Sequence, residues 1–307
     1  MIKIGMIGMN MGNGHPYSYS AMFNGFCESA LLKYCEFELI REYLPKYHSP
    51  VNQIENASVD FIWTQDKIVS EKISKVVNIP NICSSLDDLI SKSDAIILAR
   101  DDPWNREEYL RKLIKSGKPF FVDKLISSYS HELESVLEHM AGQGLVMATS
   151  AARYLPQIET IKSGFSQERL ISVHGMSRVN WERYGSHLLD PISSIIGCDY
   201  SFVRSLSPDI GHDIVQIKMK SGQNLILECI ENISLPIETN FFFEKEKPKK
   251  LLFDDFYFSF NAMMQDFIKM VTTSKLPVTV HEVANVNWMI LAGMRSKAIG
   301  GKYIDAN

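Results

Sequence analysis

The first half of this 307-residue chain alternates short apolar runs with segments that repeat apolar residues at helical spacing. The apolar runs span residues 2–7, 59–63, 95–99, 119–122 and 145–148. This alternation is typical of parallel strands joined by crossover helices. It predicts an α/β fold that begins with a Rossmann-type parallel sheet over residues 1–150.

Helix signals subdivide this half. The spacing predicts helices over about 17–32 and 66–77, and Asp102-Pro103 offers a capping acid followed by proline, a favoured helix start that Gly117 would end. Residues 33–58 form a longer connection than is usual between such elements. We interpret them as an insertion near the ligand-binding edge of the sheet, with a lid as a candidate role.

After about residue 150 the apolar pattern changes to a period of two. Val215, Ile217 and Met219 alternate with polar residues, and Ser221-Gly222 then reverses the chain into the run 225–230, which predicts a hairpin. Further strands are expected at 170–179 and 239–243, and two amphipathic helices close the chain. Residues 151–307 are therefore predicted to form an α+β domain with a mostly antiparallel sheet.

Composition excludes several classes of protein. A net charge of −4, with both signs spread along the chain, argues against a nucleic-acid partner. No apolar run reaches the roughly 18 residues that span a bilayer, so no membrane partner is expected. The five cysteines lack CxxC pairs, which favours reduced thiols in the cytoplasm. No cluster has the ligand spacing of a metal site, so no metal is expected.

The first chemical signal is the turn after the opening run, Gly8-Met9-Asn10-Met11-Gly12-Asn13. A glycine turn between a strand and a helix directs backbone amides at a phosphate. In register with G-x-G-x-x-G only Gly8 is in place, but asparagine tolerates left-handed conformations, so Asn10 and Asn13 can hold similar turns. Both a dinucleotide site, with Gly8, Asn10, Met11 and Gly12 as contacts, and an ordinary turn stay open.

The ends of two later runs carry further candidates. An acid after the second run would take the ribose hydroxyls of a dinucleotide, but here Asp66 is favoured as a helix cap. Thr64 with Lys67 would suit a 2′-phosphate, so NADP stays open beside NAD. Lys124 follows the run at 119–122, where it can stabilise a developing alkoxide or simply be solvated.

A histidine in the second half is the remaining candidate. In Gly185-Ser186-His187-Leu188-Leu189-Asp190, a histidine and an acid lie three residues apart, on one face of a helix start. Histidine titrates near neutrality, so His187 can pass a proton. A core histidine or a helix cap is the alternative.

Taken in order, these segments resemble the Gfo/Idh/MocA oxidoreductases across nearly the whole chain. The resemblance is carried by short motifs in family order: Ile4-Gly5-Met6-Ile7-Gly8, Gly117-Lys118-Pro119-Phe120-Phe121-Val122-Asp123-Lys124-Leu125, Arg153-Tyr154-Leu155-Pro156, Gly185 to Asp190, and Phe267, Pro277 and the helix over 292–300.

The resemblance implies an NAD(P)-dependent oxidoreductase that acts on a sugar, cyclitol or nucleotide sugar. Lys124 would be the catalytic lysine and His187 the general acid/base. It also implies a homodimer or homotetramer, formed through the open face of the second sheet. Further coenzyme contacts would be Arg100, Asp101, Asp123 and Lys124, and substrate contacts would be Arg153, Trp181, Arg183 and Asp190.

The sequence departs from the family pattern at several of these positions. Asp123 replaces a glutamate, Leu125 replaces a proline, and Arg183 stands where an aspartate precedes the histidine. The usual Thr-Pro-Asn is Asp101-Asp102-Pro103. These departures keep two alternatives open: a catalytically silent dinucleotide-binding sensor or partner protein, and a redox-neutral reaction in which bound NAD accepts a hydride transiently.

Overall fold

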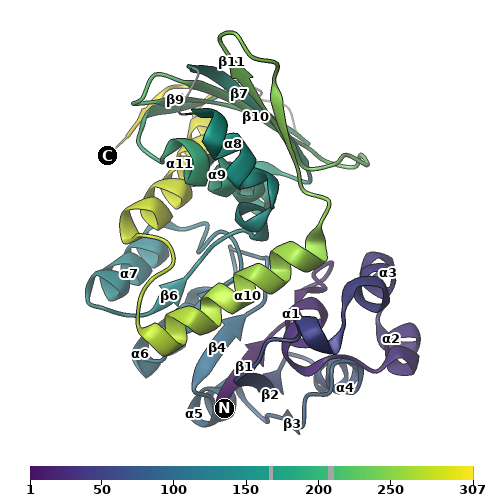
Figure 1. Ribbon diagram of the computed structural model, residues 1–307. Coiled ribbons are helices and arrows are strands. Elements are labelled where there is room, and N and C mark those ends of the chain that lie inside the picture. The colour runs from purple at the N-terminus through teal and green to yellow at the C-terminus, as the bar shows by residue number, and fades with distance from the viewer. Residues whose placement is uncertain (166–168, 207–210, 307) are drawn as a thin grey trace. The chain divides into compact units, whose positions relative to one another are not determined.

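The computed structural model describes residues 1–165, 169–206 and 211–306, which form two compact units (Figure 1). Unit 1 comprises Met1–Ile126, Glu134–Ala148 and Phe256–Val278. Unit 2 comprises Ser127–Leu133, Thr149–Asp255 and Thr279–Asn307. Each unit contains one sheet.

Unit 1 is built on a parallel sheet in the order β3-β2-β1-β4-β5-β6. Every residue of β4 and β5 is buried, as expected for parallel strands covered on both faces, which read as continuous apolar runs. The predicted Rossmann-type sheet is confirmed. Its strands are β1 (Ile2–Ile7), β2 (Ala57–Trp63), β3 (Asn81–Ile82), β4 (Ala95–Leu98), β5 (Phe120–Val122) and β6 (Val146–Met147).

The strand order reverses between β1 and β4. In open sheets of this kind, ligands bind outside the carboxyl ends of the strands at that reversal. Helices join the strands: α1 (His15–Asn24), α2 (Glu28–Tyr34), α3 (Glu38–Tyr47), the 3-10 turn η1 (Pro50–Asn52), α4 (Lys67–Val76), α5 (Leu86–Lys92), α6 (Glu107–Ser116) and α7 (Ser130–Ala141).

The single helix expected over 17–32 is wrong, because the chain breaks at Gly25. This residue has φ +67°, a conformation that glycine adopts without a steric penalty, and α1 and α2 lie on either side of it. The insertion over 33–58 contains α3 and η1. Helix α3 packs on α1, where the Tyr43 hydroxyl donates to Ser18, and it places Ile40 against Gly14 of the glycine turn. The insertion therefore lies beside that turn, and its role as a lid stays a prediction.

The helix start expected at Asp102-Pro103 is also wrong, since α6 begins at Glu107. The Asp102 carboxylate accepts hydrogen bonds from Arg100 Nε at 2.9 Å and Asn105 Nδ2 at 3.3 Å, so it stabilises a turn instead of capping a helix. The predicted end of the helix at Gly117 is confirmed.

Helix α10 (Phe256–Thr273) groups with unit 1, although the sequence analysis places it in the C-terminal domain. Its Phe260 ring lies 5.3 Å from that of Tyr19 on α1, and its Phe267 ring lies 6.2 Å from that of Phe121 on β5. The apolar face of the helix is visible in the sequence, but the sheet that it covers is not.

Unit 2 is built on a sheet in the order β12-β11-β7-β10-β9-β8-β13, in which β7 and β10 pair parallel and the other neighbours antiparallel. Alternate residues of β9 and β10 are buried, so one face packs on the core. The mostly antiparallel sheet and its hairpin are confirmed. Its strands are β7 (Leu170–Arg178), β8 (Tyr200–Ser205), β9 (His212–Met219), β10 (Asn224–Ile230), β11 (Glu238–Phe243), β12 (Lys249–Leu252) and β13 (Ile304–Asp305).

The helices of unit 2 pack on this sheet and on one another. They are the 3-10 turn η2 (Ala151–Tyr154), α8 (Gln157–Phe165), α9 (Trp181–Ile196) and α11 (Val280–Ala298). Among the helices of residues 1–165, 169–206 and 211–306, none is both long and apolar enough to cross a bilayer.

Candidate functional site

The segments that follow β1, β4 and β5 meet at the carboxyl edge of the unit 1 sheet. Asn10 joins two of them, because its Nδ2 donates to Asp101 Oδ1 at 2.6 Å and its Oδ1 accepts from the Asp101 amide at 3.0 Å. Asn13 Nδ2 donates to the Ala99 carbonyl at 3.2 Å. The expected left-handed conformations of Asn10 and Asn13 are wrong, since within this turn a positive φ occurs at Gly12. The asparagines hold the turn through their side chains.

The tip of the glycine turn is open. Gly12 has φ +80°, and a Cβ built on it would meet no atom within 4 Å. Gly8 lies in close packing, where a Cβ would come within 2.5 Å of Pro16 Cγ on α1. An open tip and a close approach of helix to strand are what a pyrophosphate site requires. The first amide of α1 is already bound by Asn13 Oδ1 at 2.8 Å, so a phosphate would meet the backbone near Gly12.

At the end of β2, the Thr64 hydroxyl, expected to suit a 2′-phosphate, is bonded within the protein. This buried hydroxyl donates to the Asp66 carbonyl at 2.5 Å, which gives Thr64 a structural role. Asp66 Oδ1 accepts from the Ile68 amide at 2.8 Å, so the favoured interpretation as a helix cap is confirmed. Gln65, which the sequence analysis did not select, accepts from Arg100 Nη1 at 3.0 Å.

We expect Asp66→Ala to lower the free energy of unfolding by about 1 kcal/mol, because it removes the cap of α4. Affinity for NADH and NADPH should stay within twofold of wild type. Urea unfolding and fluorescence titration measure the two quantities. A tenfold loss of coenzyme affinity at unchanged stability would instead assign Asp66 to the ribose.

Lys124 forms a buried ion pair. Its Nζ lies 3.3 Å from Asp101 Oδ2, and both side chains are only 4% exposed. The alternative of a merely solvated lysine is therefore wrong. Lys124 has φ +57°, which is uncommon for a residue with a side chain, so the end of β5 is specifically built to hold it. Asp101 also accepts from Asn10, and this second hydrogen bond helps to offset the desolvation of the pair.

His15 and Tyr19 of α1 bind Asp123 and were not selected as site residues from the sequence. His15 Nδ1 contacts Asp123 Oδ2, and the Tyr19 hydroxyl donates to Oδ1 at 3.2 Å. Burial favours a raised pKa for Asp123, but the neighbouring His15 and Lys124 outweigh it and hold that pKa below its usual value. Burial, reinforced by the Asp123 charge, raises the pKa of Tyr19 well above the usual range. Asp123 is thus ionised and Tyr19 neutral around neutral pH.

Two arginines fix the loops at this edge. Arg106 is 1% exposed and donates to the Asp123 carbonyl at 2.8 Å, the Ile126 carbonyl at 3.3 Å and, more closely, those of Leu125 and Arg100. Burial lowers the pKa of Arg106 to about 10, so the group stays a cation. Arg100, predicted as a coenzyme contact, is buried and pairs with Asp102, and its role toward a coenzyme stays a prediction. No sequence motif marks Arg106, because its partners are backbone carbonyls.

In unit 2 the predicted residues His187, Asp190 and Arg153 come together around Ser150. His187 Nδ1 lies 2.7 Å from Ser150 Oγ, and the Ser150 amide donates to Asp190 Oδ2 at 2.6 Å. Arg153 donates to Asp190 Oδ1 through Nη2 at 2.7 Å, and also pairs with Glu282. Despite the desolvation that opposes it, these two carboxylates raise the pKa of Arg153 above its ordinary value.

The other two predicted substrate contacts serve the start of α9. Trp181 is buried, and its indole Nε1 donates to the Ile290 carbonyl at 3.0 Å, so the structure gives it a packing role. The Arg183 amide donates to Asn180 Oδ1 at 3.1 Å, which caps the helix. Neither observation brings the Arg183 side chain to a ligand, and its substrate role stays a prediction.

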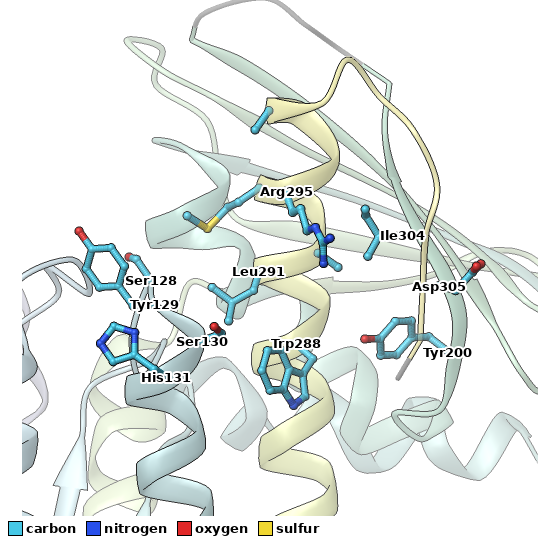
Figure 2. Close-up of a pocket in the computed structure, with 13 residues that line it drawn as sticks. Ser128, Tyr129, Ser130, His131, Tyr200, Trp288, Leu291, Arg295, Ile304 and Asp305 are labelled. Atoms are coloured by element: carbon cyan, nitrogen blue, oxygen red, sulfur yellow. The ribbon is translucent and has the colours of Figure 1, made fainter.

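Two further features of unit 2 lie outside these clusters. One potential metal-ligand atom from each of Cys198, Asp199 and His281 lies within 4.8 Å of the other two. The Asn285 side chain hydrogen-bonds to this group, and we assign no ion to it. A cavity of about 540 Å³ is lined by Trp288, Leu291 and Arg295 of α11, among others (Figure 2). None of the predicted catalytic, coenzyme or substrate residues lines it.

Comparison with known proteins identifies the fold. No protein-family model and no curated protein matches the sequence. A solved structure of myo-inositol 2-dehydrogenase from Lactobacillus plantarum has a TM-score of 0.74 at 16% identity, covering 100% of this chain and 99% of that one.

Two dehydrogenases from Lactobacillus casei are similarly close. Myo-inositol dehydrogenase in complex with NAD(H) and myo-inositol has a TM-score of 0.74 at 13% identity, covering 100% of this chain and 97% of that one. Scyllo-inositol dehydrogenase with bound NAD(H) and scyllo-inositol has a TM-score of 0.75 at 12% identity, covering 99% of each chain. The chain therefore has the fold of these inositol dehydrogenases.

Proposed function

We propose that this chain is an NAD(P)-dependent oxidoreductase of the Gfo/Idh/MocA type, which transfers a hydride between the coenzyme and a carbon that bears a hydroxyl in a cyclitol or sugar. The observation that carries the proposal is the buried Lys124–Asp101 pair, held beside an open glycine turn at the strand-order reversal. Two proteins of the same fold were solved with NAD(H) and an inositol, which supports this class of coenzyme and substrate.

The residues of the glycine turn fit a dinucleotide. Backbone groups near Gly8, Met11 and Gly12 would hold the pyrophosphate, because the tip has room for it and Asn10 fixes the turn to the loop after β4. When bound there, the coenzyme supplies the carbon that accepts or donates the hydride.

Lys124 supplies positive charge to the reacting oxygen. An ammonium group held in a buried site stabilises an alkoxide more strongly than it would in water, because no solvent must reorganise. Asp101 and Asn10 orient this charge before the substrate arrives. The resemblance assigns the accompanying proton to His187, and substrate binding to Arg153, Arg183 and Asp190.

The silent dinucleotide-binding protein stays open as a second candidate, because Arg183 stands where the family places an aspartate before His187. Arg100 Nη1 donates to the Met9 carbonyl at 3.3 Å and to Gln65 Oε1 at 3.0 Å. The side chain thereby links the ends of β4, β1 and β2 across the edge where the adenosine half of a dinucleotide would lie. An active enzyme and a silent dinucleotide-binding protein would both retain this link, so coenzyme binding and turnover must be measured separately.

We expect the purified protein to bind NADH or NADPH, and to change absorbance at about 340 nm with at least one member of a panel of inositols, sugars and nucleotide sugars. Fluorescence titration measures binding separately from turnover. Binding without turnover would support the silent candidate, unless mass spectrometry finds retained coenzyme and a converted substrate, the signature of a redox-neutral reaction. A protein that neither binds NADH or NADPH nor turns over a substrate would contradict both proposals.

The open face of the unit 2 sheet and the cysteines bear on assembly and location. The face of the unit 2 sheet opposite α9 keeps alternate residues of β9, β10 and β11 half-exposed, and we propose that a second copy covers it. A homodimer or homotetramer would follow. Five free cysteines are in keeping with a reducing compartment such as the cytoplasm.

A further inference from the structure

His15 and Asp123 form a histidine–carboxylate pair in unit 1. The carboxylate is 1% exposed and contacts His15 Nδ1, while the His15 side chain is 19% exposed. The imidazole stacks on Tyr19, with ring centres 4.9 Å apart, and meets the edge of Phe260 at 5.4 Å. The ring is therefore held from two sides and by one nitrogen, and part of it remains accessible.

This pairing determines which nitrogen of His15 is available. An ionised carboxylate accepts the proton on Nδ1, so a neutral imidazole presents a lone pair on Nε2. The same carboxylate stabilises the imidazolium that forms when Nε2 takes up a proton, as the buried aspartate does in hydrolase triads. The titratable and charged groups that face the pair are Tyr19 on α1 and Lys124 after β5, whose cation is shared with Asp101. The Arg106 cation is a further neighbour, because it donates to the Asp123 carbonyl at 2.8 Å.

The pair lies on the reactive half of the predicted coenzyme site. Strands β1 and β5 flank β4, so His15 after β1 and Asp123 after β5 meet over the end of β4. A dinucleotide on a sheet of this order places one mononucleotide on each side of the reversal, with the adenosine ribose at the end of β2. The nicotinamide would then lie on the side of β4 and β5, together with Lys124.

His187 has a different environment. Its Nδ1 is paired with the Ser150 hydroxyl, and its ring packs on Tyr184 with centres 5.0 Å apart. The nearby Asp190 carboxylate is bound by Arg153 and by the Ser150 amide. A hydroxyl group offers an imidazolium less stabilisation than a carboxylate does. Through Nδ1, His15 therefore has the carboxylate partner that stabilises an imidazolium, and the Nδ1 of His187 is bound to a hydroxyl.

We propose that His15, oriented by Asp123, is the general acid/base of the oxidoreduction; this rests on the function proposed above. In the oxidation, the substrate O–H bond breaks and its proton passes to Nε2 of His15. The electron pair of the adjacent C–H bond leaves with hydrogen as a hydride to the nicotinamide ring, which is reduced, and a carbonyl forms. The imidazolium then releases the proton to solvent, and reduction of a carbonyl runs in reverse.

The first test is chemical rescue. We expect His15→Ala to lower turnover on the order of 10²-fold, with NADH affinity within twofold, and added imidazole to restore turnover with saturation. Asp123→Asn should lower turnover in the same direction. His139→Gln is the matched control: His139 is a half-buried histidine of unit 1, stacked on Phe120 with ring centres 6.1 Å apart, and its loss should leave turnover unchanged.

Three results would overturn the assignment. Turnover could be unchanged in His15→Ala, it could be lost without any imidazole rescue, or rescue could occur in His187→Ala instead. A wild-type protein that binds NADH but turns over no substrate would contradict the proposed function itself, and the role of His15 would fall with it. If the wild-type protein is active and His15→Ala is equally active, only the role of His15 is contradicted and the proposed function stands.

The second test needs neither substrate nor coenzyme. In protein labelled with nitrogen-15 at histidine, the neutral His15 ring should carry its proton on Nδ1, the tautomer that Asp123 selects. The resonance is assigned by its absence in His15→Gln. If the neutral ring carried its proton on Nε2, that nitrogen would have no lone pair to accept the substrate proton. This result would contradict the proposal whatever the measured turnover.

Discussion

Lys124→Met is expected to lower turnover by about 10²-fold or more while NADH binding persists. The substitution keeps an unbranched apolar stem of similar reach, but removes the charge that would stabilise the alkoxide. Initial rates with the best substrate of the panel measure the loss. Lys115→Met, which removes one exposed charge from α6 of the same unit, should leave the rate unchanged.

Loss of activity in Lys124→Met has a competing explanation, because the variant leaves the Asp101 carboxylate buried without its cation. Removing one partner of a buried pair costs about 3–5 kcal/mol. The double variant Lys124→Met/Asp101→Asn removes both charges and should regain stability in urea unfolding. If it also regains turnover, Lys124 is a structural residue; if it stays inactive, the charge itself is required.

The fold was predictable because its determinants are local. The buried strands β4 and β5 are continuous apolar runs, and the β9–β10 hairpin shows strict alternation around Ser221-Gly222. The errors fall where a local signal competes with a distant partner. Asp102-Pro103 has the sequence of a helix start, but Arg100 binds the aspartate, and Phe260 of α10 packs on Tyr19 from the other end of the chain.

The candidate site was only partly predictable for the same reason. Lys124 and His187 were selected because each stands in a short motif with family order. His15 was not selected, because its partner Asp123 lies 108 residues away. No local pattern encodes that contact. Thr64 and Trp181 have side-chain types that suit ligand contacts, but their polar groups are bonded within the protein.

Arg106 illustrates a site determinant that no motif reveals, and its replacement is expected to have the largest effect on stability. Arg106→Met should lower the free energy of unfolding by about 3–5 kcal/mol. Four buried carbonyls in the loops after β4 and β5 would lose a donor, and Asp101, Asp102 and Asp123 would lose a neighbouring cation. Urea unfolding measures the loss.

Arg111→Met, at an exposed position of α6, is the control, with an expected change within about 0.5 kcal/mol. If the free energy of unfolding changed as little in Arg106→Met as in Arg111→Met, the structural role of Arg106 would be contradicted. Arg106→Lys separates charge from geometry, because lysine restores the cation but lacks the planar fork that reaches several carbonyls at once. It should recover part of the stability and little of the turnover, since the peptide groups that position Asp123 and Lys124 are held by that fork.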